Sequence, residues 1–284
     1  MHYNSVSVHI KFTKEVSMIF NPFNLVYFGF LIFIITIIVA LTLVFKKKDE
    51  KVRKQLILGI CIFNIVFYVV YKILLYVRTP GLPDTYTYIS LKELPLHLCN
   101  ISLILAPLSI FLKNKNLMSF CFFVSPLGAF FAMTFPSEGF YNCSIFNAHM
   151  IGYYGTHAII IIVGMLLVTL GFYSPSFKQI PRFILFFLIL SLSIFVVNVL
   201  IFQITGVRAN YFFTVMPEGI SILELFWSWL PVPYLYLSFA IVILLAYIAI
   251  IMTPITIIRK KRANIVNTVN TVNTVDTVDT VKSD

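Results

Sequence analysis

The chain has 284 residues, of which 60% are hydrophobic and only 11% are charged, and its mean hydropathy is +0.94. A soluble domain carries about 25% charged residues, so this composition excludes an ordinary soluble protein and indicates an integral membrane protein. The formal net charge is +10. The basic residues flank apolar segments, as topology determinants do, and this placement argues against a nucleic-acid partner.

Apolar runs recur along the whole chain, and each is long enough to cross a hydrocarbon core of roughly 30 Å. Backbone polar groups in lipid must be satisfied within the segment, and strand-like alternation is missing, so the runs predict helices. We therefore expect an all-α polytopic transmembrane bundle of about seven spans, at about 25–45, 56–77, 95–112, 117–135, 150–171, 182–204 and 232–258.

The two ends of the chain differ from this pattern. Residues 1–24 are mixed in character and predict an N-terminal extension, and Met18 is an alternative start. After Arg262 the chain reads Asn-Thr-Val three times and then Asp-Thr-Val twice. A period of three without an apolar face cannot build a core, so residues 259–284 predict a disordered low-complexity tail. The transmembrane domain then covers residues 25–258.

The Lys and Arg residues predict the orientation. The connection 46–54 holds six of them and the tail 259–284 holds five, whereas the connections on the opposite side hold few. The positive-inside rule then places the C-terminus in the cytoplasm and, with an odd number of spans, the N-terminus outside. The expected location is the cell membrane.

Polar residues gather on the predicted outer side. Such groups in a membrane are costly and usually functional, so their concentration at one depth predicts a cavity open to the outer leaflet or the outer surface. Four of them lie at the outer end of the third span, and the others lie in the loop 136–149, in the fifth span and in the last outer loop. They are Glu93, His97, Cys99 and Asn100, then His149 and His157, and then Asn210 and Tyr211.

Helix geometry restricts the pairings among these residues. Glu93 and His97 are spaced i, i+4 and share a face with Asn100. His97 and Cys99 are two residues apart and point in different directions, so a base for a Cys99 nucleophile should come from another helix, and His157 is the candidate. An imidazole can accept a thiol proton, and the first turns of a helix favour a thiolate through the helix dipole.

Other interpretations of the same residues stay open. Cys99 can be a packing residue or form a disulfide with Cys143, and His97 can simply pair with Glu93. His157 can make an interhelical hydrogen bond, and His149 can lie at the interface. Asn210 and Tyr211 can bind a head group, or cap a helix and anchor the interface. The cysteines lack zinc-site spacing, and a metal site made of His97, Cys99, His149 and His157 is a subsidiary idea.

The segment Leu94-Pro95-Leu96-His97-Leu98-Cys99 resembles the signature of the YwaF-like bacterial integral membrane proteins, which are similar to the eukaryotic transmembrane protein 164 family. Gly155-Thr156-His157, the segment 205–211 followed by Pro217, and the segment 229–234 resemble further family segments in the same order. The resemblance covers roughly residues 20–260.

This resemblance implies a polytopic helical fold and, from the eukaryotic branch, cysteine-dependent acyl transfer between phospholipids. By motif position Cys99 would be the acyl-accepting nucleophile and His157 its base. Asn100 or Asn210 could donate to the oxyanion, and neither a cofactor nor a metal is required. The alternative functions are a small-molecule transporter and a membrane protein that binds a ligand without catalysis.

Overall fold

The computed structural model describes residues 19–77, 91, 94–136 and 140–281. Most of this part is helical, which confirms the expected all-α membrane bundle. Six helical segments are long and apolar enough to span a membrane, and Leu98–Leu112 is a shorter apolar helix. The six are Leu25–Phe45, Glu50–Leu74, Lys115–Thr134, Ala148–Thr169, Phe177–Thr205 and Leu235–Lys261.

The bounds of the described helices and strands follow the chain from α1 to α10. The α-helices are α1 (Leu25–Phe45), α2 (Glu50–Val77), α4 (Leu98–Leu112), α5 (Lys115–Ser119), α6 (Ser125–Thr134), α7 (Ala148–Thr169), α8 (Ile180–Thr205), α9 (Ser221–Trp229) and α10 (Ser238–Val281). A π-helix, η1 (Phe120–Val124), joins α5 to α6. Within the described residues, the short 3₁₀ helices are η3 (Phe177–Gln179), η4 (Tyr211–Phe213) and η5 (Leu235–Leu237), and the short strands are β1 (Ile19–Phe20) and β2 (Cys143–Ser144).

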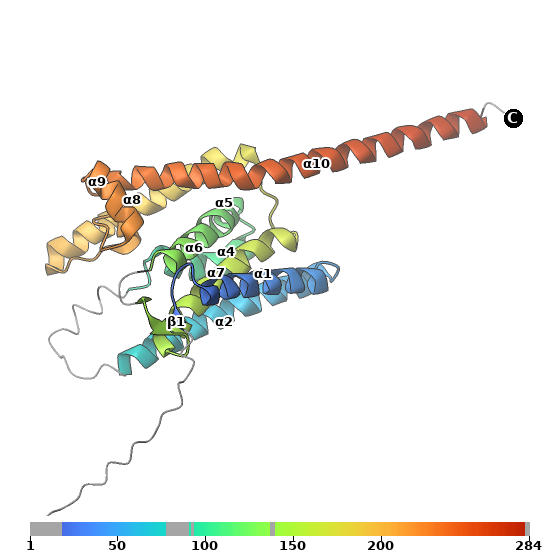
Figure 1. Ribbon diagram of the computed structural model, residues 1–284. Helices are drawn as coiled ribbons and strands as arrows, with labels where there is room; N and C mark the ends of the chain where they lie inside the picture. Colours follow the sequence, from blue (N-terminus) through green and yellow to red (C-terminus); the bar gives the residue numbers. More distant parts are fainter. Residues whose placement is uncertain (1–18, 78–90, 92–93, 137–139, 282–284) are drawn as a thin grey trace, which may run out of the picture.

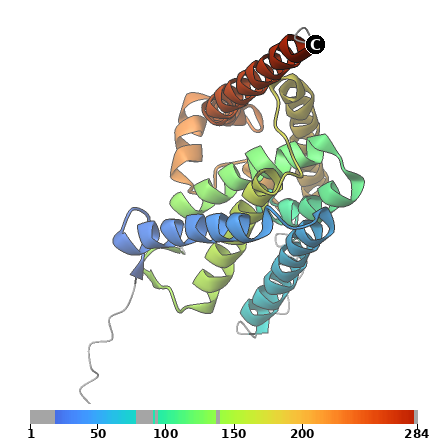
Figure 2. The same ribbon diagram turned by 90° about the vertical axis from the view of Figure 1, so that its right-hand side faces the viewer.

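The helices form two layers. Helices α8, α9 and α10 lie together over the bundle of α1, α2 and α4–α7, as two perpendicular views show (Figures 1 and 2). The π-helix η1 lies between the layers, where it contacts α4, α7 and α10. All five of its residues are buried. A π-turn is wider than an α-turn and is frequent at functional sites, and here it directs a run of consecutive side chains into the core.

The chain just before α1 belongs to the folded body. Strand β1 pairs antiparallel with β2, with Ile19 opposite Ser144 and Phe20 opposite Cys143. The Phe20 side chain is buried in the main core, and Asn21 Nδ2 donates to Asn142 Oδ1 at 2.7 Å. The last part of the predicted extension 1–24 is therefore structured, and residues 1–18 lie outside the described residues.

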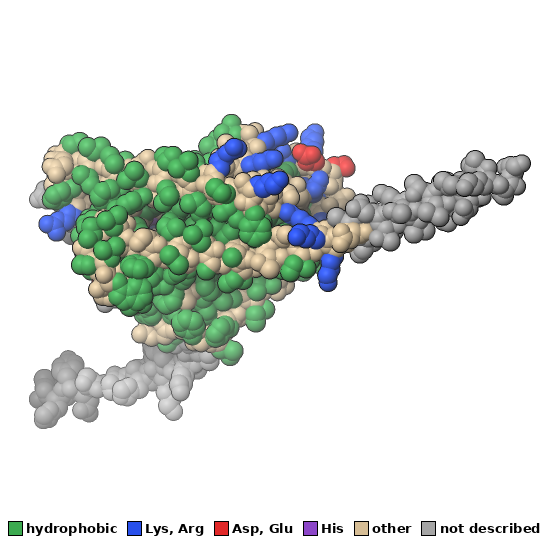
Figure 3. Space-filling view, turned by 90° about the horizontal axis from the view of Figure 1, so that it is seen from above, with side chains coloured by type: hydrophobic (Ala, Val, Ile, Leu, Met, Phe, Trp, Pro, Cys, Tyr) green, Lys and Arg blue, Asp and Glu red, His purple; other side chains and the backbone are tan. Residues whose placement is uncertain are grey.

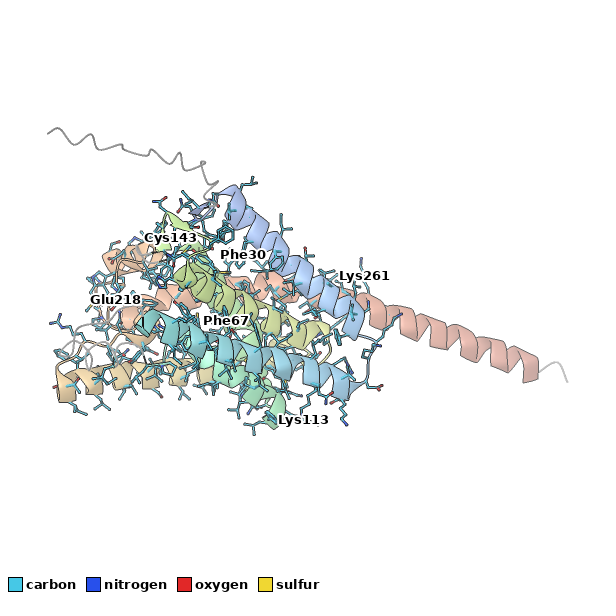
Figure 4. The ribbon with its side chains drawn as sticks, turned by 90° about the horizontal axis from the view of Figure 1, so that it is seen from below. Phe30, Phe67, Lys113, Cys143, Glu218 and Lys261 are labelled. Carbon is cyan, nitrogen blue, oxygen red and sulfur yellow. The ribbon has the colours of Figure 1, made fainter. Side chains whose placement is uncertain are left out.

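Basic side chains gather at one end of the bundle (Figure 3). There Arg53 donates to the carbonyl oxygen of Leu170, and Arg259 donates to that of Pro175. Lys113 and Lys261 lie towards this end, whereas Cys143 and Glu218 lie at the other (Figure 4). The connections that are richest in Lys and Arg therefore share one end of the molecule, and the predicted topology stays a prediction.

Several predicted boundaries differ from the structure. Helix α2 begins at Glu50 and not at 56, and α10 begins at Ser238 and not at 232. Helix α4 begins at Leu98, three residues after the predicted start of the third span, because the Leu94–His97 segment forms a turn instead. Helix α10 continues through the Asn-Thr-Val repeat to Val281, so a helical backbone occupies most of the segment that the sequence predicts as a disordered tail. The division of the chain into extension, transmembrane domain and tail stays a prediction.

Candidate functional site

The site begins at the first residues of α4. His97 is the N-cap of this helix, with an extended backbone (φ −68°, ψ 153°), and Cys99 is the second helical residue. The expectation that His97 lies within the helix, one turn after Glu93, is therefore wrong, and Glu93 itself lies outside the described residues. Because His97 precedes the helix, His97 and Cys99 can face one space although they are two residues apart.

A cavity of about 680 Å³ extends between the two layers of helices. Its wall brings together five predicted site residues: Cys99, His157, His97, Asn100 and His149. They come from the start of α4 and from α7, and these two helices are in contact. The prediction that polar residues of the third and fifth spans share a cavity agrees with this arrangement.

Most of the cavity wall is apolar. Helices α6, α8, α9 and α10 supply branched and aromatic side chains, among them Leu127, Phe131, Phe187, Phe226, Ile241 and Leu244. The ionisable and amide groups come from α2, from the start of α4, from α7 and from the loop before α9. The cavity thus joins a polar region to a long apolar region, a combination that suits an amphipathic ligand.

The hydrogen bond made by His157 determines its tautomer. Its Nδ1 lies 2.6 Å from the carbonyl oxygen of Tyr153, one turn earlier on α7. A carbonyl oxygen only accepts, so Nδ1 carries the proton and Nε2 of the neutral ring keeps its lone pair. The Tyr153 ring also contacts the imidazole, with ring centroids 4.4 Å apart, and its hydroxyl donates to the Ala132 carbonyl oxygen at 2.9 Å. These contacts fix the imidazole as a proton acceptor.

Cys99 faces α7. It packs against a buried cluster that contains Leu103, Ala129 and Ile160, and Ile160 follows His157 by three residues on one face of α7. Cys99 carries a free thiol, so the alternative disulfide with Cys143 is not formed. Within the described ranges, no three His, Cys, Asp or Glu side chains are placed to hold a metal ion, so the subsidiary metal site has no support in the geometry.

Asn210 and Tyr211 do not line the cavity but organise the loop behind it. The Asn210 amide donates to the Met216 carbonyl oxygen at 2.7 Å and accepts from the Val215 amide at 2.9 Å. Tyr211 is fully buried, and its ring meets the His97 ring edge-on, with centroids 5.3 Å apart. The structure therefore does not bring these two predicted site residues to the cavity wall.

One buried amide holds this loop against α8. Asn198 Nδ2 donates to the Tyr211 carbonyl oxygen at 2.9 Å and to Thr214 Oγ1 at 2.8 Å, and Asn198 Oδ1 accepts from the Tyr211 amide at 3.0 Å. Asn198 was not among the predicted site residues, although a single Asn in an apolar span is a signal of such a bond.

A close approach of two helices sets the position of α2 beside α7. A Cβ added to Gly152 would lie 1.9 Å from Cδ2 of the Tyr71 ring, so only glycine fits there. Three residues of α2, spaced i, i+3 and i+4, line the cavity: Tyr68, Tyr71 and Lys72. Lys72 was not among the residues predicted for the site, although a lone charge in an apolar run is itself a sign of function.

Thr156, which precedes His157 in the sequence, carries a buried hydroxyl without a hydrogen-bond partner among the described residues. Thr156 is 3% exposed and lines the cavity, and its Oγ1 has no hydrogen-bond partner in the part of the chain that the structure describes. A buried hydroxyl without a partner costs about 1–3 kcal/mol, and this one belongs to a residue of the cavity wall that was not among the predicted site residues.

These features define a multi-pass helical membrane protein with a cavity that is polar at one side and apolar along most of its wall. The sequence model of the TMEM164 family matches residues 19–252, and the chain belongs to this family. The match includes Cys99 and His157 and confirms the family expected from the Leu94–Cys99 segment, while the YwaF-like grouping stays a prediction. Comparisons with curated proteins and with solved structures give no match.

Proposed function

We propose that this protein is a cysteine-dependent acyltransferase that acts on phospholipids of the cell membrane. The observation that supports this function is that a thiol from α4 and an imidazole from α7 line one cavity whose remaining wall is mostly apolar. The apolar wall suits acyl chains, and the two reactive groups suit ester chemistry. Membrane phospholipids are the proposed partners, and the chemistry uses no cofactor.

In the proposed reaction, the Cys99 sulfur attacks the ester carbonyl of a phospholipid while His157 Nε2 accepts the thiol proton. The tetrahedral intermediate collapses to a thioester and a lysophospholipid, whose alkoxide takes the proton from His157. A hydroxyl of a second lipid then attacks the thioester and gives its proton to His157. This step releases the new ester and restores the thiol when the proton returns to sulfur.

Asn100 is the proposed donor to the oxyanion. It lines the cavity one residue after Cys99, and an amide N–H₂ that points at the developing charge would stabilise it. Asn210 does not serve in this role because its amide is bonded to the backbone of its own loop.

The proposed membrane arrangement has seven crossings, with the basic end in the cytoplasm, the N-terminus outside and the cavity towards the outer side. Helix α4, with 15 residues, counts as the seventh crossing. At 1.5 Å per residue it extends about 22 Å, less than a hydrocarbon core of roughly 30 Å. The turn before it and the polar residues at its start extend the crossing to the outer surface.

Acyl exchange on defined lipids tests the function. The full chain is reconstituted in phospholipid vesicles with a labelled lysophospholipid, and Cys99→Ala is compared with Cys143→Ala, which changes a thiol outside the cavity. We expect Cys99→Ala to abolish exchange and Cys143→Ala to retain it. Unchanged exchange in Cys99→Ala would remove Cys99 from the mechanism. If the wild-type chain showed no acyl exchange, and both it and Cys99→Ala moved a solute or a lipid across the vesicle membrane, the protein would be a transporter.

A further inference from the structure

We infer that Lys72, together with His149, binds the phosphate of the phospholipid headgroup at the wall that α2 and α7 share. The first observation is the direction in which Lys72 points. Its neighbours Val69, Val70, Ile73 and Leu74 are 47–54% exposed and form the outer face of α2. Lys72 is half-buried on the opposite face and lines the cavity with Tyr68 and Tyr71.

This placement distinguishes Lys72 from a lysine that merely extends to the membrane surface. A lysine that snorkels keeps its charge in water along the lipid-facing side of a helix. The Lys72 ammonium instead lies over the rings of Tyr68 and Tyr71, 5.9 and 5.8 Å from their centroids. Tyr71 is itself held by its close contact with Gly152. The cation is thus held at the cavity by two aromatic rings.

A second cationic or donor group is placed beside it. His149 lines the same cavity, and its ring stacks on Tyr71 with an interplanar angle of 17° and centroids 6.2 Å apart. His149 belongs to the first turn of α7, which begins at Ala148. The positive end of the α7 dipole therefore lies at this part of the wall and also favours an anion.

The spacing between Gly152 and His157 along α7 fits a single lipid that is bound both at its phosphate and at its ester. Tyr71 packs at Gly152, which precedes His157 by five residues, or about 7.5 Å along the helix axis at 1.5 Å per residue. A glycerol unit separates the phosphate of a phospholipid from its acyl esters. A phosphate held at Lys72 would thus allow the ester to reach the level of Cys99 and His157, with the acyl chains along the apolar wall. The choice of a phospholipid rests on the proposed function.

Lipid binding by the full chain tests this inference without any need for turnover. Native mass spectrometry compares phosphatidylglycerol with diacylglycerol of the same acyl chains, in the wild-type chain and in Cys99→Ala. Lys72→Gln is expected to weaken phosphatidylglycerol binding at least tenfold relative to diacylglycerol, and Lys72→Arg is expected to retain the preference. Cys99→Ala is expected to stop acyl exchange without changing the preference for phosphatidylglycerol. Loss of exchange in Cys99→Ala and loss of the phosphatidylglycerol preference in Lys72→Gln therefore test the proposed function and the proposed phosphate site separately.

Lys54→Gln is the matched control. Lys54 also lies on α2 with its ammonium over an aromatic ring, 5.3 Å from the centroid of Phe111, but it does not line the cavity. Its replacement is expected to leave the preference for phosphatidylglycerol unchanged. If Lys72→Gln kept the wild-type preference for phosphatidylglycerol over diacylglycerol, the inference would be overturned. Displacement of phosphatidylglycerol by millimolar inorganic phosphate would identify free phosphate as the ligand and would overturn the lipid assignment.

Discussion

His157 Nδ1 is bonded to the carbonyl oxygen of Tyr153 at 2.6 Å, so the imidazole turns its unprotonated Nε2 away from its own helix backbone. A histidine fixed in this way is a proton acceptor with a set direction. The same ring lines the cavity that Cys99 lines from α4. This relationship connects the fold to the proposed chemistry, and the first prediction follows from it.

Replacing His157 with Ala removes the proposed base. We expect the rate of acyl exchange to fall by about 10²–10⁴-fold, the usual contribution of general acid–base catalysis, while phospholipid binding stays within twofold of wild type. Single-turnover formation of the Cys99 thioester, followed by intact-protein mass spectrometry, measures the chemical step. A thioester that forms at the wild-type rate in His157→Ala would assign the proton transfer to another group.

Replacing Asn100 with Ala removes the proposed oxyanion donor. Loss of one such donor typically lowers the turnover rate by about 10²–10³-fold, and we expect a decrease of this size with the lipid affinity preserved. Asn116→Ala, in α5 at the opposite end of the bundle, is the control and should exchange acyl chains normally. If the decrease in acyl exchange in Asn100→Ala were fully explained by weaker lipid binding, Asn100 would bind the substrate and not stabilise the oxyanion.

Replacing Gly152 with Ala should destabilise the contact between α2 and α7. The added methyl group would overlap the Tyr71 ring, and overpacking of this kind costs about 1–3 kcal/mol. Gly59→Ala is the matched control, because a Cβ at Gly59 meets nothing within 4 Å and alanine is the better helix former. Thermal unfolding in detergent should show a lower midpoint for Gly152→Ala only. Equal midpoints would mean that the two helices can separate at no cost.

Replacing Asn198 with Ala should loosen the loop that contains Tyr211. The substitution removes the acceptor of the Tyr211 amide, and a buried group left without a partner costs about 1–3 kcal/mol. The Tyr211 carbonyl oxygen loses one donor but keeps those of Thr214. Limited proteolysis should therefore cut residues 206–220 faster than in wild type. Ser193→Ala, at an exposed position of the same helix, should not change the cleavage rate. Equal protection in both variants would show that the loop is held by other contacts.

The spans and part of the site could be predicted from the sequence because they depend on local pattern. Long apolar runs are helical wherever backbone groups must bond within the segment, and the Leu94–Cys99 segment indicated the family directly. Cys99 and His157 were selected because polar residues in apolar spans are conspicuous. The third and fifth predicted spans run in the same direction, so both begin on the predicted outer side. This is why Cys99 and His157 were expected to share a cavity.

The rest depends on contacts between residues far apart in the sequence. At the start of α4, His97 packs against Tyr211 and Phe213. In the π-helix, Phe120 packs against Phe186 and Phe187. A local sequence pattern does not contain these contacts. Asn210 was a candidate for substrate binding, but its amide is used by its own loop. Lys72 was not among the predicted site residues, because the sequence does not show that its face of α2 lines the cavity.

Labelling with a thiol-reactive phospholipid analogue tests most directly whether the Cys99 thiol and the His157 imidazole act together on a lipid. The full chain in membranes is treated with the analogue, and the modified cysteine is identified by peptide mass spectrometry. We predict modification of Cys99 in preference to Cys61, Cys121 and Cys143, protection by excess phospholipid, and a much slower reaction in His157→Ala. Modification spread over the four cysteines, or labelling of Cys99 that neither phospholipid nor His157→Ala affects, would contradict the account.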